Sequence, residues 1–119
     1  MHKKLLKVDR NSLILKKPEG ISIWEKTEIA EAFGIKDKTK MGAGIHKIKE
    51  FEVTYAHEVD DVLYILEGEM IIESNGEKKV FSPGDFAYIK GGKNKITIIV
   101  KEYAKLLFVT YPADWKKER

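Results

Sequence analysis

The sequence predicts an all-β protein, a single domain built as a jelly-roll barrel with a short N-terminal extension. About eight short apolar segments alternate with turn signals along the chain, which is the pattern of a sandwich or small barrel. Few segments have a convincing helical period. The 119 residues suffice for one hydrophobic core, and no linker or internal repeat divides them.

The N-terminal part, residues 1–39, is expected to contain two short strands and one short helix. Residues 28–33 read Glu-Ile-Ala-Glu-Ala-Phe, a sequence that could form one or two turns of helix. Thr27 is a suitable N-cap for this helix, and Gly34 would close it. The two expected strands are residues 12–15 and 21–25.

The barrel itself is expected between residues 40 and 112, where short strands are separated by turn residues. Residues 74–77, Ser-Asn-Gly-Glu, predict a tight type I′ hairpin, because both central residues tolerate positive φ. Residues 82–85, Ser-Pro-Gly-Asp, predict a type II turn, and the glycine pair 91–92 ends another strand. The expected strands are 44–55, 62–73, 78–81, 85–89, 95–101 and 105–111.

Side-chain alternation predicts which residues point into the barrel. In residues 51–57 the odd positions are aromatic, apolar or histidine and the even ones are polar or small, so Tyr55 and His57 should face inward. Residues 62–66 are apolar on both faces, so this strand should be covered on both sides. The alternation changes after Gly68, which predicts a kink or bulge there.

The composition excludes several classes of protein. A hydrophobic fraction of 43% with 34% charged residues is typical of a soluble globular protein. No apolar run approaches the length of a membrane span, and no signal-peptide core is present, so a cytoplasmic protein without membrane contact is expected. Absence of cysteine excludes disulfides and thiol chemistry. The net charge of +3 and the scattered lysines give no one-sided basic patch, so nucleic acid is not an expected partner.

Residues 55–68 carry the most informative motif. They read Tyr-Ala-His-Glu-Val-Asp-Asp-Val-Leu-Tyr-Ile-Leu-Glu-Gly and have the spacing His-x-His-x3-Glu-x6-Gly, with Tyr55, His57, Asp61 and Gly68 in the four slots. In this frame the segment resembles the first motif of the cupin superfamily, which supplies most of the metal ligands there. One ligand is kept, one is shortened from Glu to Asp, and one is replaced by a phenol.

The second cupin motif, Gly-x5-Pro-x-Gly-x2-His-x3-Asn, is present in part. Both glycines are kept, whereas the proline, the fourth metal ligand and the asparagine are replaced. The slots hold, in order, Gly84, Lys90, Gly92, Lys95 and Ile99. The resemblance implies a single-domain, RmlC-like cupin over residues 1–119, a double-stranded β-helix with its core at about 40–112.

A narrower resemblance is carried by Met-Gly-Ala-Gly at 41–44, by residues 62–69, and by Val-Thr-Tyr-Pro-Ala-Asp-Trp at 109–115. These segments are similar to the ethanolamine-utilisation protein EutQ family, with its Met-x-Ala-Gly strand, Val-Leu-Glu-Gly-Glu core and Pro-Ala-Asn-Trp ending. The resemblance implies a role in ethanolamine or related small-molecule metabolism. It also implies association with a bacterial microcompartment and an acetate-kinase-like phosphotransfer from ATP.

The motif residues disfavour a tightly bound transition metal, and no cofactor is expected. The phenol of Tyr55 and the ammonium of Lys95 belong to side-chain types that keep their protons at neutral pH, and an ammonium would repel a cation. If a divalent metal binds, His57 and Asp61 are its ligands, with His46 or Glu50 on the preceding strand as possible helpers. Two conventional ligands are too few for a tight site.

Three roles stay open for Tyr55, His57 and Asp61. They could form a catalytic hydrogen-bonded set with His57 as general base. They could bind a polar small molecule without reaction, together with Lys95 if that side chain faces the cavity, although alternation points it outward. Otherwise His57 is a satisfied core histidine beside Tyr55.

The corresponding functions are a EutQ-like cupin, a metal-free binding or sensor cupin, and a metal-dependent cupin isomerase or oxygenase. The residues alone show no phosphate cradle that would support a kinase. The expected partners are a small-molecule ligand and a second copy of the chain. Extra apolar strand faces and an N-terminal strand available for pairing predict the homodimer.

Overall fold

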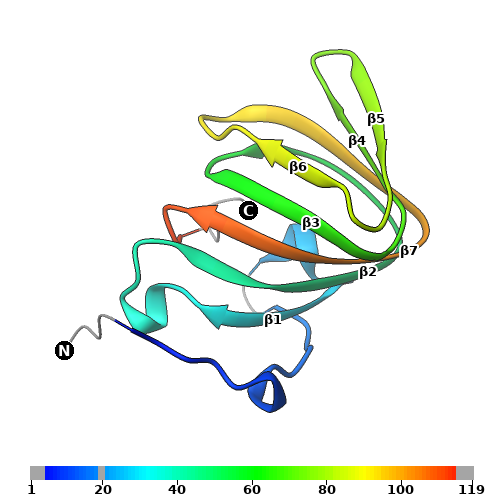
Figure 1. The fold of residues 1–119 in the computed structure, drawn as a ribbon. Coiled ribbons are helices and arrows are strands. Elements are labelled where there is room, and N and C mark those ends of the chain that lie inside the picture. Colours follow the sequence, from blue (N-terminus) through cyan, green and yellow to red (C-terminus); the bar gives the residue numbers. More distant parts are fainter. Residues whose placement is uncertain (1–4, 19–20, 115–119) are drawn as a thin grey trace.

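The computed structural model describes residues 5–18 and 21–114 and confirms the all-β jelly roll (Figure 1). Seven antiparallel strands form a curled sheet in the order β1-β2-β7-β3-β6, with β4 joined to β7 and β5 to β4. No helix in these residues is long and apolar enough to cross a membrane. The strands are β1 (Glu28–Phe33), β2 (Gly42–His57), β3 (Asp60–Gly68), β4 (Met70–Ser74), β5 (Glu77–Phe81), β6 (Phe86–Ile89) and β7 (Asn94–Tyr111), with short 3-10 turns η1 (Arg10–Ser12), η2 (Ser22–Trp24) and η3 (Ile35–Asp37).

Two long strands, β2 and β7, fold the sheet into two layers. They pair with each other over almost their whole length. The second half of β7 also pairs with β3, and its first half pairs with β4. Layer A therefore contains β1, the first half of β2, the second half of β7, β3 and β6. Layer B contains the second half of β2, the first half of β7, β4 and β5, and β2 changes layer at a register shift where Glu50 has φ 34°.

The core lies between the two layers, where alternate residues of every long strand point inward. Ile48, Ile65 and Leu106 are among the fully buried side chains. Residues before β1 complete this core, because Ile21 and Trp24 at the η2 turn are buried in the same cluster. The N-terminal segment is thus part of the barrel wall, and burial of its apolar side chains contributes to stability.

The turns follow the prediction. Asn75 and Gly76 have φ of 53° and 76°, as a type I′ hairpin requires. Gly84 has φ of 95°, and the Asp85 N–H donates to the Ser82 carbonyl at 2.9 Å, as in a type II turn.

The kink predicted at Gly68 is also present. Gly68 has φ of 75° at the end of β3. A Cβ atom added to it would overlap the backbone carbonyl of Tyr103, so the position requires glycine for two reasons.

The helix predicted for residues 28–33 is wrong, because these residues form strand β1. They pair with β2, from Glu28 opposite Lys47 to Phe33 opposite Ala43. A helix of one or two turns is marginal in water, and pairing with β2 satisfies the backbone while burying Ile29 and Ala30.

Other predicted boundaries also change. Residues 12–15 form no strand; the η1 turn and a single bridge between Lys16 and Ile29 lie there. Residues 21–25 form no strand and contain the η2 turn. Segments 95–101 and 105–111 are one continuous, bent strand. Residues 62–66 are covered on one side only within the chain, because Val62 and Leu66 are exposed.

Candidate functional site

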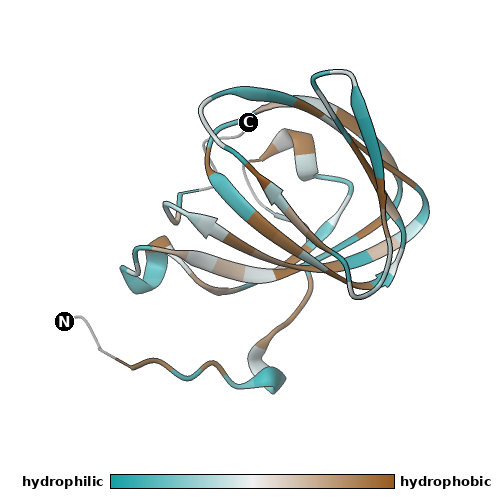
Figure 2. Cartoon of the chain, turned by 45° about the horizontal axis from the view of Figure 1, so that its top comes forward, coloured by the Kyte–Doolittle hydropathy of each residue, from teal (hydrophilic) through white to brown (hydrophobic). Residues whose placement is uncertain are grey.

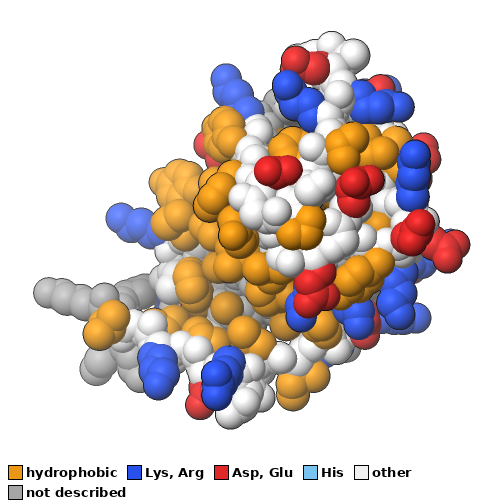
Figure 3. Space-filling view, turned by 45° about the vertical axis from the view of Figure 1, so that its right-hand side comes forward, with side chains coloured by type: hydrophobic (Ala, Val, Ile, Leu, Met, Phe, Trp, Pro, Cys, Tyr) orange, Lys and Arg blue, Asp and Glu red, His pale blue; other side chains and the backbone are white. Residues whose placement is uncertain are grey.

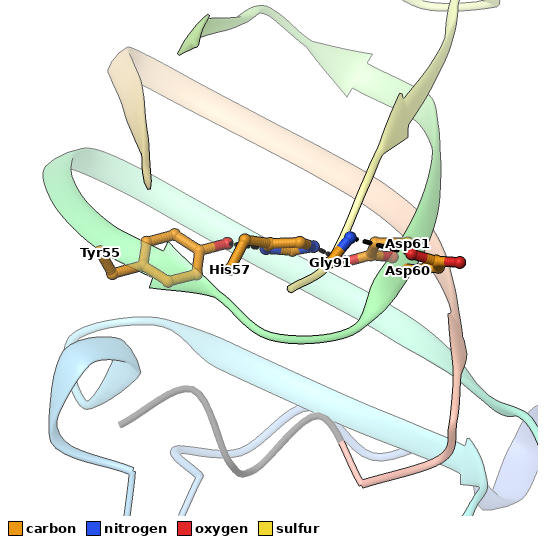
Figure 4. A network of polar contacts seen from close by, with 5 residues as sticks. All are labelled: Tyr55, His57, Asp60, Asp61 and Gly91. Carbon is orange, nitrogen blue, oxygen red and sulfur yellow. Dashed lines mark hydrogen bonds and ion pairs between the residues drawn. The ribbon is translucent and has the colours of Figure 1, made fainter. Parts of the chain in front are cut away.

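Tyr55, His57 and Asp61 come together between the two layers, where β2 ends and β3 begins (Figure 4). The Tyr55 hydroxyl lies 2.9 Å from His57 Nδ1. His57 Nε2 lies 3.8 Å from Asp61 Oδ2. The neighbouring Asp60 points differently and accepts a hydrogen bond from the Gly91 N–H at 2.9 Å. The first three side chains therefore lie in a row, with His57 between Tyr55 and Asp61.

His57 is neutral at physiological pH. Its side chain is fully buried, and this burial lowers its pKa to about 4, although the charge of Asp60 acts to raise it. At 3.8 Å from Nε2 the Asp61 carboxylate is beyond hydrogen-bonding distance, but its charge favours the single imidazole proton on that nitrogen. In this tautomer Nδ1 accepts from the Tyr55 hydroxyl.

A second buried histidine, His46, lies deeper in the barrel on the same strand. Its Nε2 is 2.7 Å from the Thr27 hydroxyl, which itself donates to the Trp24 carbonyl at 2.7 Å. Because that hydroxyl has one proton, His46 donates and Thr27 accepts. Burial lowers the pKa of His46 to about 3, so it too is neutral. His46 is a satisfied core histidine, and its Nε2 is not available as a metal ligand.

A cavity of about 40 Å³ opens beside these groups. Its walls are mainly apolar and include Trp24, Leu63 and Phe108, and its polar lining comes from Tyr55, His46, Asp61 and Thr110. The volume suits a few water-sized groups and is far below the roughly 300–1,000 Å³ of ordinary ligand pockets. It can hold only a molecule of a few heavy atoms.

Thr110 is a polar residue of the cavity that the sequence did not single out. It pairs directly with Asp61 across β3 and β7. Its hydroxyl is buried and has no hydrogen-bond partner in residues 5–18 and 21–114. A buried hydroxyl without a partner is costly, so a bound polar group would be stabilised at this position. The signal that could have found Thr110 is its place as a polar residue among the inward positions of β7.

The structure does not place all the predicted site residues together. Lys95 is exposed and pairs with Ala56 on the outer side of layer B, so it does not reach the cavity. His57 lies behind Tyr55 and does not line the cavity. Its role is to position Tyr55, while Tyr55, Asp61 and Thr110 can touch a ligand.

The donor set does not fit the metal centre that cupins commonly hold. The first ligand slot is the phenol of Tyr55, which is engaged with His57, and the fourth slot is the outward-facing Lys95. Within the described residues, no three His, Asp or Glu side chains are grouped as a ligand set. A tight transition-metal site needs more such donors than this cluster supplies.

An antiparallel jelly roll with a polar cluster in the slots of the first cupin motif defines the protein as a cupin. A solved RmlC-like cupin from Shewanella frigidimarina NCIMB 400 has the same fold, with a TM-score of 0.72 at 18% identity over 96% of each chain. The chain belongs to the family of the ethanolamine utilisation protein EutQ, whose family model matches residues 19–117. The predicted superfamily and family are both confirmed.

One relative in sequence supports this assignment, and a solved structure shares the fold. The protein named acetate kinase EutQ from Clostridioides difficile strain 630 is 31% identical over 88 residues, which cover 74% of this chain and 55% of that protein. This chain thus spans little more than half the length of that curated relative. A solved ethanolamine utilization protein Q from Salmonella typhimurium LT2 matches with a TM-score of 0.78 at 21% identity, over 96% of this chain and 93% of that one.

Proposed function

We propose that this chain serves in ethanolamine or related small-molecule metabolism by binding a small polar molecule in its barrel cavity. The observation that carries the proposal is the polar edge of an otherwise apolar cavity, formed by Tyr55, Asp61 and the buried hydroxyl of Thr110. A mostly apolar pocket with a few convergent polar groups is the usual form of a small-molecule site. Family membership supports the metabolic setting.

The size of the cavity limits the ligand. Acetate and ethanolamine, the molecules named in the relatives, have four heavy atoms each and match a cavity of about 40 Å³. In this arrangement the Thr110 hydroxyl can donate to the ligand, whereas the Tyr55 oxygen, whose proton goes to His57, and the Asp61 carboxylate accept from donors on the ligand. Ethanolamine carries such donors in its ammonium and hydroxyl groups. His57 holds the Tyr55 hydroxyl in place.

Calorimetry with acetate and with ethanolamine tests this proposal. Thr110→Val should weaken binding of the ligand by about tenfold, because one buried hydrogen bond is worth about 1.4 kcal/mol. Thr97→Val, a matched change on the outer side of layer B, should leave binding unchanged. Absence of heat and of chemical-shift change with either molecule, at concentrations that saturate a millimolar site, would refute the proposal.

Phosphotransfer of the acetate-kinase type is the second candidate function. Besides the name of the relative, one observation favours it. A cleft of about 260 Å³ lies between the β4–β5 hairpin and β6, and its lining includes Lys79 and Lys90. Ile89 lines both this cleft and the inner cavity. Two lysines beside a small cavity are a plausible place for the phosphates of a nucleotide next to an acceptor.

ATP with Mg²⁺ is the probe for this candidate. The expected result is binding that weakens several-fold in Lys90→Ala and persists in Lys101→Ala, a lysine outside the cleft, together with acetyl phosphate formation from acetate. Binding of acetate or ethanolamine without ATP binding would leave the cavity proposal standing and remove the kinase. Association with a bacterial microcompartment is part of the proposed metabolic role, and co-purification with shell proteins tests it.

A further inference from the structure

The cavity beside Tyr55 has a negatively charged lining. Among the described residues that line it, Asp61 is the one charged side chain, and there is no Lys or Arg. His46 also lines the cavity and is neutral, because burial lowers its pKa to about 3. His57, which lies behind Tyr55, is neutral for the same reason, with a pKa of about 4. The two imidazoles therefore leave the negative charge of the lining unchanged.

Lysines that neighbour cavity residues in sequence point to the outer side of their strands. Lys47 and Lys105 pair with each other across β2 and β7, each between inward-facing residues. Lys90 follows the cavity residue Ile89 and is exposed. On the face drawn in Figure 3 the Lys and Arg side chains project outward into solvent, where water and salt screen their charges. In Figure 2 the strands of layer A have long hydrophobic stretches, so the charge of Asp61 acts in apolar surroundings, where electrostatic interactions are stronger.

The hydrogen-bonding groups of the cavity are mainly acceptors. The Asp61 carboxylate can only accept, and the Tyr55 oxygen gives its proton to His57 and keeps its lone pairs for a ligand. His46 donates its Nε2 proton to a neighbouring hydroxyl, so its other nitrogen can only accept. Among the oxygen and imidazole groups of the lining, only the Thr110 hydroxyl can donate to a ligand. The cavity is therefore suited to a ligand that is rich in donors.

We propose that the cavity selects a small ammonium cation, the protonated form of a primary amine, and excludes carboxylates. The inference rests on the proposed function, because it specifies the charge of the molecule that the same cavity binds. A primary amine is protonated at neutral pH, as the amine of lysine is, and Asp61 would be its counter-ion. A carboxylate would instead place two negative charges in one small cavity, which is unfavourable. The inference therefore favours ethanolamine over acetate, the substrate that the kinase would need.

The positions of the polar groups suit a ligand with two different ends. Thr110 lies directly opposite Asp61 on the neighbouring strand, so one ammonium group can donate to both the carboxylate and the hydroxyl. Tyr55 lies on the other side of the His57 ring from Asp61 (Figure 4), so its oxygen is available to a second donor on the ligand. Ethanolamine has both ends, an ammonium and a hydroxyl joined by two carbons, and acetate has neither.

NMR titration with three molecules of matched size tests the inference without any substitution. Ethanolamine is the cation, ethylene glycol is its neutral counterpart with a hydroxyl in place of the ammonium, and acetate is the anion. At equal ionic strength and neutral pH, ethanolamine should bind at least about tenfold more tightly than ethylene glycol, and acetate should not bind. Triethylammonium has the charge of ethanolamine but is too large for a cavity of about 40 Å³. It should not bind either, which distinguishes the cavity from surface carboxylates.

Asp61→Asn and Asp60→Asn are a matched pair of variants. Each removes one negative charge, at neighbouring positions. Asp60 does not line the cavity and accepts from the Gly91 N–H, a hydrogen bond that asparagine can keep. Asp61→Asn should raise the dissociation constant of ethanolamine by about a hundredfold, and Asp60→Asn should leave it unchanged. Thermal unfolding checks that both variants are folded, and the ligand series on the unaltered chain does not depend on them.

Two results would overturn the inference and leave the proposed function in place. One is binding of acetate or ethylene glycol as tight as that of ethanolamine. The other is an equal dissociation constant of ethanolamine in Asp61→Asn and in the unaltered chain. Either result would mean that the cavity binds small polar molecules without selecting a cation. Absence of binding by all three molecules would remove the inference and the proposed function together.

Discussion

Tyr55, His57 and Asp61 behave as one unit because the orientation of each polar atom is set by the next. Burial keeps His57 neutral, the charge of Asp61 at 3.8 Å favours the proton on Nε2, and Nδ1 then accepts from the Tyr55 O–H at 2.9 Å. The ligand-facing hydroxyl is therefore held by a residue that does not itself touch the cavity. This arrangement suits positioning and binding better than proton abstraction, because a histidine with a pKa of about 4 is a weak base.

Replacing Tyr55 by Phe should raise the pKa of His57. The hydroxyl donates to Nδ1 and so stabilises the neutral imidazole, and its loss moves the pKa from about 4 toward the ordinary value of 6.5. The free energy of unfolding should fall by about 1 kcal/mol. NMR titration of the imidazole resonances measures the pKa, with Tyr64→Phe on the outer face as control. An unchanged or lowered pKa would mean that Nδ1 carries the proton and the hydroxyl accepts.

Stability should decrease as the pH falls below about 6.5. The pKa values of His46 and His57 are lowered to about 3 and about 4 in the folded protein. The unfolded state therefore binds more protons between these values and 6.5, so the stabilisation is complete above 6.5 and is lost toward pH 4 and pH 3. At pH 5 the loss is about 2 kcal/mol per histidine.

Urea unfolding at pH 7.5 and pH 5 measures this change. His46→Phe keeps an aromatic ring in the core and removes one titrating group, so its loss of stability between the two pH values should be about half that of the unaltered chain. Equal losses in the two proteins would show that His46 is not protonated on unfolding in this range.

Individual residues show why the site was only partly predictable from the sequence. Alternation alone placed Tyr55 and His57 on the inner face, because they are two residues apart on one strand. Thr110 was not predicted as a cavity residue, because its place depends on pairing with β3, which is distant in sequence. His46 was predicted only as a helper ligand for a metal, because its contact with Thr27 also joins distant parts of the chain. Lys95 occupies a motif slot but points outward, as its alternation with the buried Ile96 and Ile98 indicated.

At the scale of elements, pairing with a neighbouring strand determined the secondary structure where local helix or strand propensity was weak. Residues 28–33 contain good helix formers, yet β2 offers them a partner strand and a core to face. Helix propensity is worth only tenths of a kcal/mol per residue, so this tertiary pairing decided the outcome. The 74–77 hairpin and the kink at Gly68 were predictable, because each depends on a positive φ at glycine or asparagine.

Gly68→Ala should be much more destabilising than Gly76→Ala. The two glycines have nearly the same φ, 75° and 76°, so the backbone strain of a Cβ is matched at about 1 kcal/mol. At Gly76 nothing lies within 4 Å of the added Cβ, whereas at Gly68 it overlaps the Tyr103 carbonyl. The overlap should add about 2 kcal/mol or more. Chemical denaturation measures the free energy of unfolding of both variants. Equal losses of this free energy would mean that β7 moves away from the added Cβ at no cost.

At the scale of the whole molecule, the strands of layer A serve two surfaces at once. Their inner residues, such as Leu63, Asp61 and Thr110, line the cavity, and residues between them, such as Val62, are exposed on the outer side. The N-terminal segment forms another part of the cavity wall, since Trp24 lines the cavity and packs on Tyr55 with ring centroids 5.3 Å apart.

A chain that begins at residue 40 should not fold. It lacks Ile21 and Trp24, which are buried in the core, and it leaves the edge of β2 without its partner β1. Loss of two such side chains costs about 5 kcal/mol or more, which is comparable to the whole stability of a small domain. A chain beginning at residue 15 is the control, because the η1 turn contains no buried residue. Thermal unfolding should be cooperative for the control and absent for the shorter chain. Cooperative unfolding of the 40–119 chain would mean that β2 to β7 form a barrel on their own, and that the N-terminal segment only closes the cavity.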